Sequence, residues 1–520
     1  MRIFDRKSAG LLIPLFSIRT GEEWGVGEYP DLITFAKWAR TGGFRWLLTL
    51  PLLEPSPGQE SPYSSASFFA LDPLYIALRD VPEFAALGGL ASLDPQERLT
   101  LDAVSAAASV DHAGIRWLKG RVLARCFESF EASGPSGRKQ AFDTFVKEQA
   151  AWLEPYVLFR TLKEAHPESW RSWPEGLRDR TPSVINAFKN KHARSLQYRR
   201  YLQWTASTQL EAARQGMHEV GVALAGDEPF LVADDSADVW ANRKHFRFDA
   251  TVGAPPDAFS ADGQEWGLPP YQWDLLKADG YALFAARGAH TARLYDAVRI
   301  DHVVGLYRTY HRPIDKSAHF FYPDVQADQL AQGEAVLKAF RNSGTEILAE
   351  DLGVIPPFVR LSLQRLGIPG YRVFRWEQEQ GRFRDPETWP ELSVATTGTH
   401  DTESSLDWWQ ELPEWERKAA LVLPKLRDAA ATLDEKNPGR MSEAVWRALL
   451  ATVIESPSRA VLLPIQDVLH VRDRINTPNT VGPENWSHRL SWTVAALGTD
   501  SILQGRMRIV RAYNEASGRV

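Results

Sequence analysis

Three short apolar stretches that each end in an acidic residue constrain the fold of this chain more than any other feature. Asp296–His302, Thr345–Gly353 and Ser393–Asp401 have the composition of buried strands, and polar or charged side chains follow each apolar run. Acidic groups at the C-terminal ends of successive parallel strands are how a (β/α)₈ barrel builds its active site. The pattern therefore favours an α/β fold with a parallel barrel.

The spacing of the acidic residues supports this interpretation. Glu350 lies 49 residues after Asp301, and Asp401 lies 51 residues after Glu350. Each step is close to one strand–helix unit with a long loop, so we expect the three carboxylates on successive strands. An earlier run, Gly221–Gly226, also resembles a strand and leads into Asp227.

Other segments follow the periods of helices and strands. We expect helices over 31–41, 330–341 and from 357, strands over 44–50, 221–226, 297–300, 346–349 and 459–464, and irregular structure over 226–274. The whole chain, 1–520, is predicted to be a single catalytic (β/α)₈ TIM barrel with three insertions. These are a helical subdomain over about 95–215, a loop-rich substrate-binding subdomain over about 226–290, and a helical segment over about 403–455.

Composition excludes several classes of protein. The 520 residues carry a net charge of −6, which argues against nucleic acid as a partner. The single cysteine, Cys126, rules out an intramolecular disulfide and fits a reducing compartment. The N-terminus does not resemble a signal peptide, and no apolar run reaches the length of a membrane span. We therefore expect a cytoplasmic protein, and its 19 tryptophans suit one that stacks on sugars.

The acidic residues suit retaining glycosyl transfer, in which one carboxylate attacks the anomeric carbon and a second, about 5 Å away, acts as acid and base. Arg299 and Asp301 are two residues apart and share a strand face, so the arginine holds Asp301 ionised as the nucleophile. Glu350 follows an apolar run and neighbours Asp351; burial and like charge should raise its pKa, as a general acid requires. Asp401 would bind sugar hydroxyls.

The same residues admit other interpretations. His302 and His400 would donate hydrogen bonds to sugar hydroxyls, but with the three carboxylates they could instead hold a divalent metal in a hydrolase barrel. Arg299 would repel such a cation, and the chain has no His-x-His or His-Glu-x-x-His pair. Each cluster taken alone could also be structural, as an ion pair, a helix cap or a loop. Their joint occurrence at barrel spacing argues against that alternative.

Nine motifs in order then identify a known family. They are Ser61-Pro62-Tyr63, Gly226-Asp227-Glu228-Pro229, Asp235-Ser236-Ala237-Asp238-Val239-Trp240, Gly253-Ala254-Pro255-Pro256-Asp257, Gly263-Gln264-Glu265-Trp266-Gly267, Arg299-Ile300-Asp301-His302, Ala349-Glu350-Asp351-Leu352-Gly353, Gly398-Thr399-His400-Asp401, and Gln466-Asp467 with Arg474-Ile475-Asn476-Thr477-Pro478 and Asn485-Trp486. From about residue 6 to 490 the chain resembles the 4-α-glucanotransferases of the amylomaltase type, glycoside hydrolase family 77, which are related to the α-amylases.

The resemblance implies a (β/α)₈ barrel and a two-step retaining transfer of α-1,4-glucan segments between maltodextrins, in cytoplasmic maltodextrin or glycogen metabolism. Matched by motif, Asp301 is the nucleophile, Glu350 the acid/base and Asp401 the transition-state carboxylate. The residues implied in or beside the sugar subsites are Tyr63, Asp227, Gln264, Trp266, Arg299, His302, His400 and Asn476. No metal or organic cofactor is implied, and the expected partners are maltooligosaccharides, starch or glycogen, with no nucleic acid or membrane.

The chain departs from the family pattern near these motifs. The family's Phe-Arg-Gly-Phe is Val303-Val304-Gly305-Leu306 here, Leu268 stands for an asparagine, and Thr402 stands for another. Such changes leave the chemistry intact and bear on donor and acceptor preference. An α-glucan hydrolase of the same chemistry and a non-catalytic α-glucan-binding relative are the alternatives. An inactive relative would be free to lose one of the three carboxylates, and all three are kept.

Overall fold

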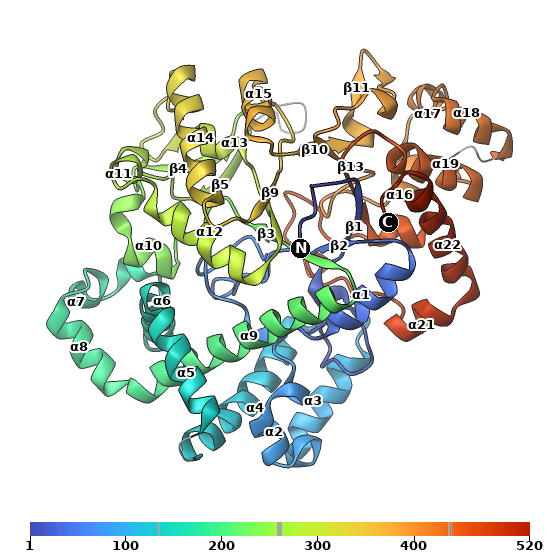
Figure 1. The fold of residues 1–520 in the computed structure, drawn as a ribbon. Coiled ribbons are helices and arrows are strands. Elements are labelled where there is room, and N and C mark those ends of the chain that lie inside the picture. Colours follow the sequence, from blue (N-terminus) through green and yellow to red (C-terminus); the bar gives the residue numbers. More distant parts are fainter. Residues whose placement is uncertain (134–135, 257–262, 435–436, 438) are drawn as a thin grey trace.

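A closed barrel of parallel strands forms the centre of the protein in the computed structural model, which describes residues 1–520 except 134–135, 257–262, 435–436 and 438. Asp257 of the fourth motif lies outside the described residues. Within the described residues eight strands close in the order β1-β14-β13-β10-β9-β6-β3-β2 (Figure 1). They are β1 Ser8–Leu12, β2 Trp46–Leu48, β3 Ala223–Glu228, β6 Ala297–Ile300, β9 Glu346–Ala349, β10 Gly370–Val373, β13 Ser393–Thr396 and β14 Ala460–Pro464. The predicted barrel is confirmed.

Burial on both faces explains why these short runs are strands. Nearly every residue of the barrel strands is buried, as expected for a parallel sheet covered by helices. The register pairs Ile300 of β6 with Ala349 of β9, and Asp227 of β3 with Arg299 of β6. The residues that follow β6 and β9, Asp301 and Glu350, therefore emerge side by side at one rim of the barrel.

The expectation that Glu350 and Asp401 follow successive strands is wrong. β6 and β9 are neighbours, as the spacing of 49 residues suggested, but β10 lies between β9 and β13. The 51-residue step thus holds an additional strand, and Asp401 follows the strand after next. The 51 residues are enough for this additional strand because no α-helix lies in the connection from β10 to β13, residues 374–392, all of which are described.

Helices surround the barrel on its outer side. Those that alternate with the strands or follow the last one are α1 Asp31–Thr41, α9 Ala193–Glu219, α12 Ala282–Leu294, α14 Gln326–Arg341, α15 Pro357–Leu366, α19 Glu443–Ile454 and α22 Ser501–Ala516. Shorter helices between or after them are α10 Ala237–Ala241, α11 Trp273–Ala278, α13 Val304–Tyr307, α16 Ser405–Glu411, α17 Glu414–Ala420, α18 Pro424–Ala429, α20 Ile465–Leu469 and α21 Val494–Thr499. In the part of the chain that is described, no helix is both long and apolar enough to cross a membrane.

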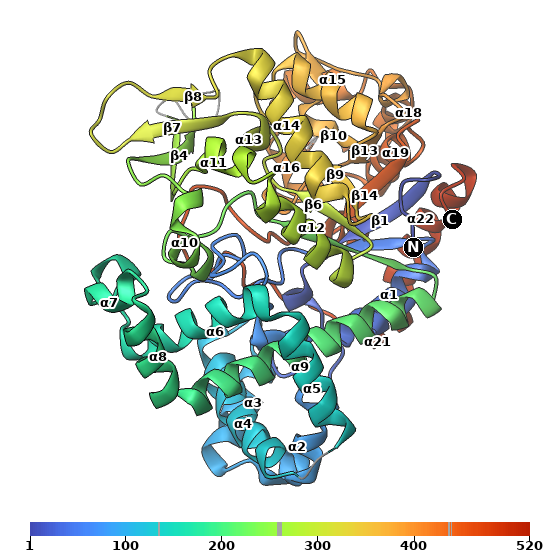
Figure 2. The same ribbon diagram turned by 60° about the vertical axis from the view of Figure 1, so that its left-hand side comes forward.

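A helical lobe lies to one side of the barrel (Figure 2). It contains α2 Pro82–Ala86, α3 Pro95–Ala106, α4 His112–Ala132, α5 Gly137–Glu148, α6 Ala150–Ala165, α7 Glu175–Arg178 and α8 Pro182–Lys191. The long helix α9 runs from this lobe to the barrel, where it precedes β3. The helices of the lobe span residues 82–191, and the helical insertion over about 95–215 stays a prediction of domain organisation.

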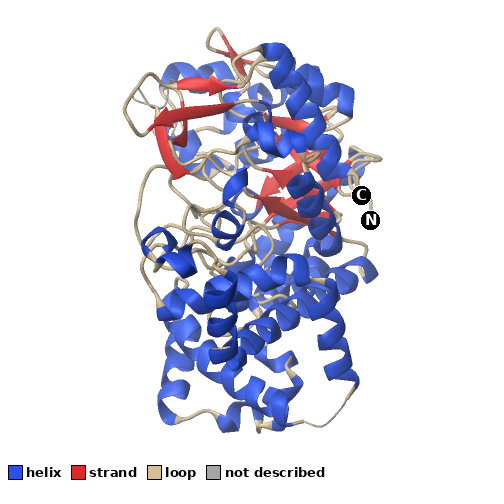
Figure 3. Ribbon diagram, turned by 90° about the vertical axis from the view of Figure 1, so that its left-hand side faces the viewer, coloured by secondary structure: helices blue, strands red, loops and turns tan. Residues whose placement is uncertain are grey.

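A small antiparallel sheet stands apart from the barrel, at the end of the molecule away from the helical lobe (Figure 3). Its strands are β4 Ala250–Ala254, β5 Gln264–Leu268, β7 Thr309–Pro313 and β8 Phe320–Tyr322, in the order β5-β4-β7-β8. The first two lie in the region expected to be irregular, so that expectation missed them. A separate hairpin pairs β11 Gln378–Glu379 with β12 Arg382–Phe383.

Candidate active site

Arg299 joins two carboxylates at the C-terminal rim of the barrel. Its guanidinium donates to both oxygens of Asp227 at 2.8 Å and lies 2.8 Å from Asp301 Oδ1. The expected shared strand face of Arg299 and Asp301 is therefore confirmed. Arg299 and Asp227 are almost fully buried, and burial raises the pKa of Asp227 while the guanidinium opposes that rise.

Glu350 is held by two backbone donors. Its Oε2 accepts from the amide of His302 at 2.7 Å, and its Oε1 accepts from the amide of Leu352 at 2.8 Å. His302 has a φ of +47°, in the left-handed region, and this turn directly follows Asp301. Burial raises the pKa of Glu350 to about 7; the charge of Asp301 adds to the rise, and Arg299 opposes it.

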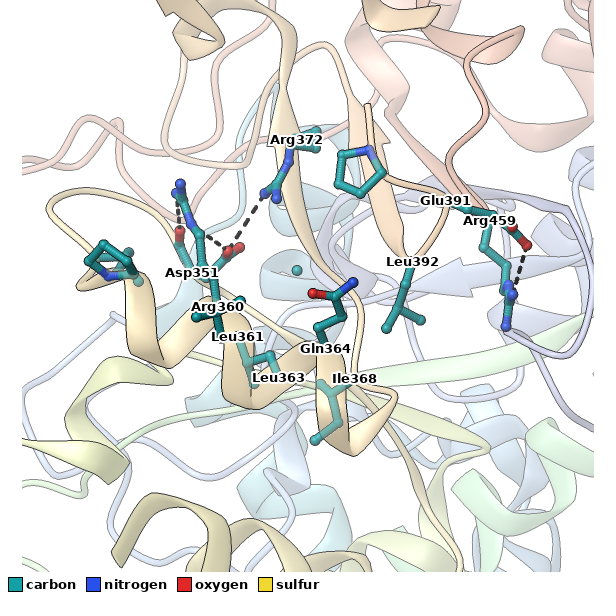
Figure 4. Close-up of a pocket in the computed structure, with 14 residues that line it drawn as sticks. Asp351, Arg360, Leu361, Leu363, Gln364, Ile368, Arg372, Glu391, Leu392 and Arg459 are labelled. Carbon is teal, nitrogen blue, oxygen red and sulfur yellow. Dashed lines mark hydrogen bonds and ion pairs between the residues drawn. The ribbon is translucent and has the colours of Figure 1, made fainter. Parts of the chain in front are cut away.

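The rise in the Glu350 pKa was expected, but the expected like charge from Asp351 was wrong. Successive residues point to opposite sides of the chain, and Asp351 faces the outside of the barrel. There it accepts from the amide of Tyr371 at 2.6 Å and from Arg360 at 3.2 Å, and it lies 3.6 Å from Arg372 (Figure 4). Asp351 therefore has a structural role, and the like charge comes from Asp301.

A chain of polar contacts links Asp227 to Asp401. The Tyr63 hydroxyl donates to Asp227 Oδ2 at 2.7 Å and lies 3.1 Å from Nε2 of His400, whose ring stacks on the tyrosine with centroids 5.4 Å apart. His400 Nε2 is in turn 3.4 Å from Asp401 Oδ2, and Asn476 donates to Asp401 Oδ1 at 2.6 Å. Tyr63, from a loop far away in the sequence, thus belongs to the same cluster as the carboxylates.

The three carboxylates differ in their access to solvent. The side chains of Asp301 and Asp401 are 29% and 40% exposed, whereas Glu350 is buried. The cluster therefore offers two accessible carboxylates beside a buried one that can hold a proton near neutral pH. Such a difference in environment separates a nucleophile from an acid.

Gln264 and Trp266 lie beside His302. Both are on β5, where Trp266 Nε1 donates to Gln264 Oε1 at 3.0 Å. The indole meets the His302 ring edge to face, with centroids 4.8 Å apart. Burial lowers the pKa of His302 to about 4, so its imidazole is neutral at pH 7. These three residues line a cavity of about 330 Å³, which we call the rim cavity, together with the loop 352–355.

The structure also identifies neighbours that the sequence did not single out as site residues. Tyr371 of β10 is buried beside Arg299 and hydrogen-bonds to it. Trp486 belongs to one of the nine motifs but was given no role. The centroid of its ring lies 5.7 Å from that of Tyr63 and 6.0 Å from that of His400. The signal for Tyr371 was weak because β10 is a four-residue strand that contains an arginine.

Most of the residues that depart from the family pattern either fill space in the core or stabilise a loop. Val303 and Leu306 are buried in the core beneath the rim, where they act by filling space. Thr402 accepts from the amide of Thr399 and donates to its carbonyl, both at 3.0 Å, and so closes the loop that carries Asp401. Leu268, at the end of β5, is partly buried against the core.

The described part of the chain contains no cluster of three His, Cys, Asp or Glu residues arranged to hold a metal ion. The charges of Asp227 and Asp301 are instead matched by the single guanidinium of Arg299. The geometry therefore gives no support to the alternative in which Asp301, Glu350 and Asp401 ligate a cation with the two histidines.

Comparisons with known proteins find relatives along nearly the whole chain. The family model described as 4-alpha-glucanotransferase matches residues 13–494. A 4-alpha-glucanotransferase of Thermus thermophilus is 32% identical over 490 residues, covering 90% of this chain and 92% of the relative. One from Chlamydia pneumoniae is 30% identical over 492 residues, covering 92% and 91%. The structure of an amylomaltase from Streptococcus agalactiae in complex with acarbose superposes with a TM-score of 0.83 at 22% identity, covering 99% of this chain and 100% of that one.

Proposed function

The chain belongs to the 4-alpha-glucanotransferases of glycoside hydrolase family 77 and acts on α-1,4-glucans, and from this premise we propose that Asp301, Glu350 and Asp401 carry out its transfer reaction. The observation that supports the assignment best is the contrast between two neighbouring carboxylates. Asp301 is accessible and in contact with Arg299, whereas Glu350 is buried with a pKa of about 7. The first suits a nucleophile and the second an acid that later acts as a base.

In the first step, the Asp301 carboxylate attacks the anomeric carbon of the donor glucan, and the glycosidic bond breaks. Glu350 gives its proton to the leaving oxygen, so the shortened glucan departs with a free 4-hydroxyl. Arg299 pairs with the Asp301 carboxylate and holds it in place before the attack. Asp401, held by Asn476 and facing solvent, binds the sugar hydroxyls and favours the distorted ring of the transition state.

In the second step, the 4-hydroxyl of an acceptor glucan attacks the same carbon, and the ester bond to Asp301 breaks. The hydroxyl proton passes to Glu350, which restores the starting protonation states. Tyr63, Asp227 and His400 hold the donor sugar at the cleaved bond, and Gln264, Trp266 and His302 form the acceptor side. His302 is neutral and can donate or accept a hydrogen bond there.

The proposed substrates are maltooligosaccharides and the longer chains of starch or glycogen. The related amylomaltase of Streptococcus agalactiae was solved with acarbose, and the aromatic rings at the rim suit stacking on glucose units. We propose that the segment over about 226–290, which includes β4 and β5 of the antiparallel sheet, is a substrate-binding subdomain. The single cysteine supports a cytoplasmic setting, and the net charge of −6 argues against nucleic acid as a partner. We propose no membrane partner.

Product analysis with maltotriose as the only substrate tests this function. We expect glucose and a ladder of longer maltodextrins, separated by chromatography and identified by mass spectrometry. The ladder forms because the glycosyl group on Asp301 is transferred to another glucan rather than to water. Glucose and maltose without longer products would instead identify a hydrolase, and unchanged maltotriose would contradict the assigned reaction.

We expect the rate to fall as pH rises above about 7. Glu350 must be protonated in the first step, and its pKa of about 7 means that the active form is lost above that pH. A plot of kcat/KM for maltotriose should therefore decline about tenfold per pH unit on its basic side. The measurement is initial rate from pH 5 to 9.

A donor with a leaving group that needs no proton provides the control. With α-maltosyl fluoride as the donor, the fall in kcat/KM at basic pH should largely disappear, because fluoride departs without a proton in the first step. The Glu350→Gln variant should show no such decline with either donor. A wild-type profile that stays flat up to pH 9 with maltotriose would contradict the role of Glu350.

A further inference from the structure

The rim cavity has a second group of residues that the proposed mechanism does not use. Beyond His302 and Trp266, it is lined by Arg308 at the end of α13, Tyr310 on β7 and Phe321 on β8. Its volume of about 330 Å³ is at the lower end of the range for small-molecule sites. Tyr310 and Phe321 are in contact, with ring centroids 5.0 Å apart, so this end of the cavity has an aromatic wall.

Arg308 is a cation with no acidic partner among the residues that the structure describes. Its Cζ lies 4.0 Å from the centre of the Phe321 ring, which positions the guanidinium over the aromatic wall. Its Nε is buried without a hydrogen-bond partner in the described part of the chain. Burial alone lowers the pKa of Arg308, with no contribution from a neighbouring charge, and an arginine keeps its proton under such conditions.

The three arginines of another cavity are all paired. A larger cavity on the outside of the barrel contains Arg360, Arg372 and Arg459, and each lies beside a carboxylate, Asp351 or Glu391 (Figure 4). No aspartate or glutamate is among the described residues that line the rim cavity. Since its histidine is neutral at pH 7, Arg308 supplies the net charge of that lining. The described lining of the rim cavity thus carries a positive charge, in a protein whose total charge is −6.

The rim cavity adjoins Glu350 through two of its lining residues. His302 and Leu352, whose amides hold the Glu350 carboxylate, both line it. Asp301 and Arg299, whose charges act on Glu350, are not among the described residues that line it. An acceptor sugar in the cavity would place its 4-hydroxyl at Glu350. Its reducing end, across the ring, would point along α13 towards Arg308.

We propose that Arg308 makes the rim cavity selective for acceptor sugars that carry an anionic group at the reducing end, of which glucose 1-phosphate is the simplest. This inference rests on the proposed function and extends it to the acceptor. The acceptor's 4-hydroxyl oxygen forms the new bond to the anomeric carbon as the bond to Asp301 breaks, and its proton passes to Glu350. The phosphate stays on the acceptor throughout and binds the guanidinium in a bidentate pair.

The test compares two acceptors that share the α-linked group at the reducing end and differ in charge. Maltotriose is the donor, and glucose 1-phosphate or methyl α-glucoside is the acceptor; mass spectrometry distinguishes the two products. We expect kcat/KM for the phosphate acceptor to exceed that for the neutral one by at least about tenfold, as a hydrogen bond between charged groups can provide. Arg308→Gln should abolish this preference, and Arg308→Lys should keep part of it.

Two controls make the outcome specific. Arg247→Gln removes an arginine that is paired with Asp249 near the same sheet, and it should leave the preference as in the wild type. Thermal unfolding midpoints close to that of the wild type show that each variant is folded. Equal use of both acceptors by the wild type, or an equal loss for both in Arg308→Gln, would overturn the inference. Absence of the ladder in the wild type would instead overturn the proposed function.

Discussion

Replacing Asp301 with alanine is expected to lower the transfer rate by about 10⁴- to 10⁶-fold, the range measured when a catalytic nucleophile is removed. The loss should be in kcat, because the variant keeps the groups that bind the donor and lacks only the atom that attacks it. Arg299 retains its contacts with Asp227, so the fold is not at risk. The measurement is initial rate with maltotriose, with thermal unfolding as a check on folding.

The stereochemistry of rescue distinguishes the two catalytic carboxylates. With α-maltosyl fluoride and azide, Asp301→Ala should form the β-azide, because azide attacks directly from the vacated face. Glu350→Ala keeps the nucleophile, passes through the ester to Asp301, and should form the α-azide. Asp315→Ala, which removes an exposed carboxylate after β7, is the matched control and should behave as the wild type. Rescue of Asp301→Ala with retention would assign the nucleophile elsewhere.

Replacing Arg299 with methionine is expected to destabilise the protein by about 3–5 kcal/mol as well as to inactivate it. Asp227 would remain buried with no cation beside it, and an unpaired buried charge is far more costly than a missing contact. The stability loss should be larger at pH 8 than at pH 5. Burial already raises the pKa of Asp227, so at low pH the carboxyl is protonated and the cost of an unpaired buried charge is absent. As pH rises the carboxyl ionises, and that cost returns.

The double variant Arg299→Met/Asp227→Asn tests the cause of that loss. Removing the second charge should restore at least half of the lost stability at pH 8, measured by denaturant midpoints, while activity stays absent. The two single changes and the double change form a cycle that isolates the interaction between the residues. If the double variant is no more stable than Arg299→Met alone, the buried charge does not cause the destabilisation.

The barrel strands that carry chemistry could be predicted from the sequence, because their local composition is decisive. The run 297–300 contains two strong strand formers, and its apolar faces must be buried wherever it lies. The contact of Arg299 with Asp301 follows from the period of two along a strand, and so does the failure of Asp351 to act on Glu350. The alternation of side chains along a strand thus predicts the contact between Arg299 and Asp301, and it also explains why the predicted effect of Asp351 on Glu350 was wrong.

Elements that depend on distant partners could not be predicted. β10 has four residues, one of them Arg372, and it is a strand because β9 and β13 lie on either side of it. β4 and β5 lie in a segment rich in Gly and Pro, and β4 is ordered by pairing with β7, some sixty residues later. Likewise, no local pattern links Tyr63 to Asp227 across 164 positions. Arg308 has no motif at all, and its lack of an acidic partner among the described residues is visible only in three dimensions.

The pairing of β1 with β14 has a consequence for synthesis on the ribosome. Residues 8–12 form one of their two strand contacts with residues 460–464, so the barrel cannot close until nearly the whole chain has been made. At about 5–20 residues per second, this delay lasts roughly 25–90 s. Throughout that time the free side of β1 is an unpaired edge on a nascent chain. Sheet closure is therefore a late step in biogenesis, and chains that end before β14 should be prone to aggregation and suited to chaperones.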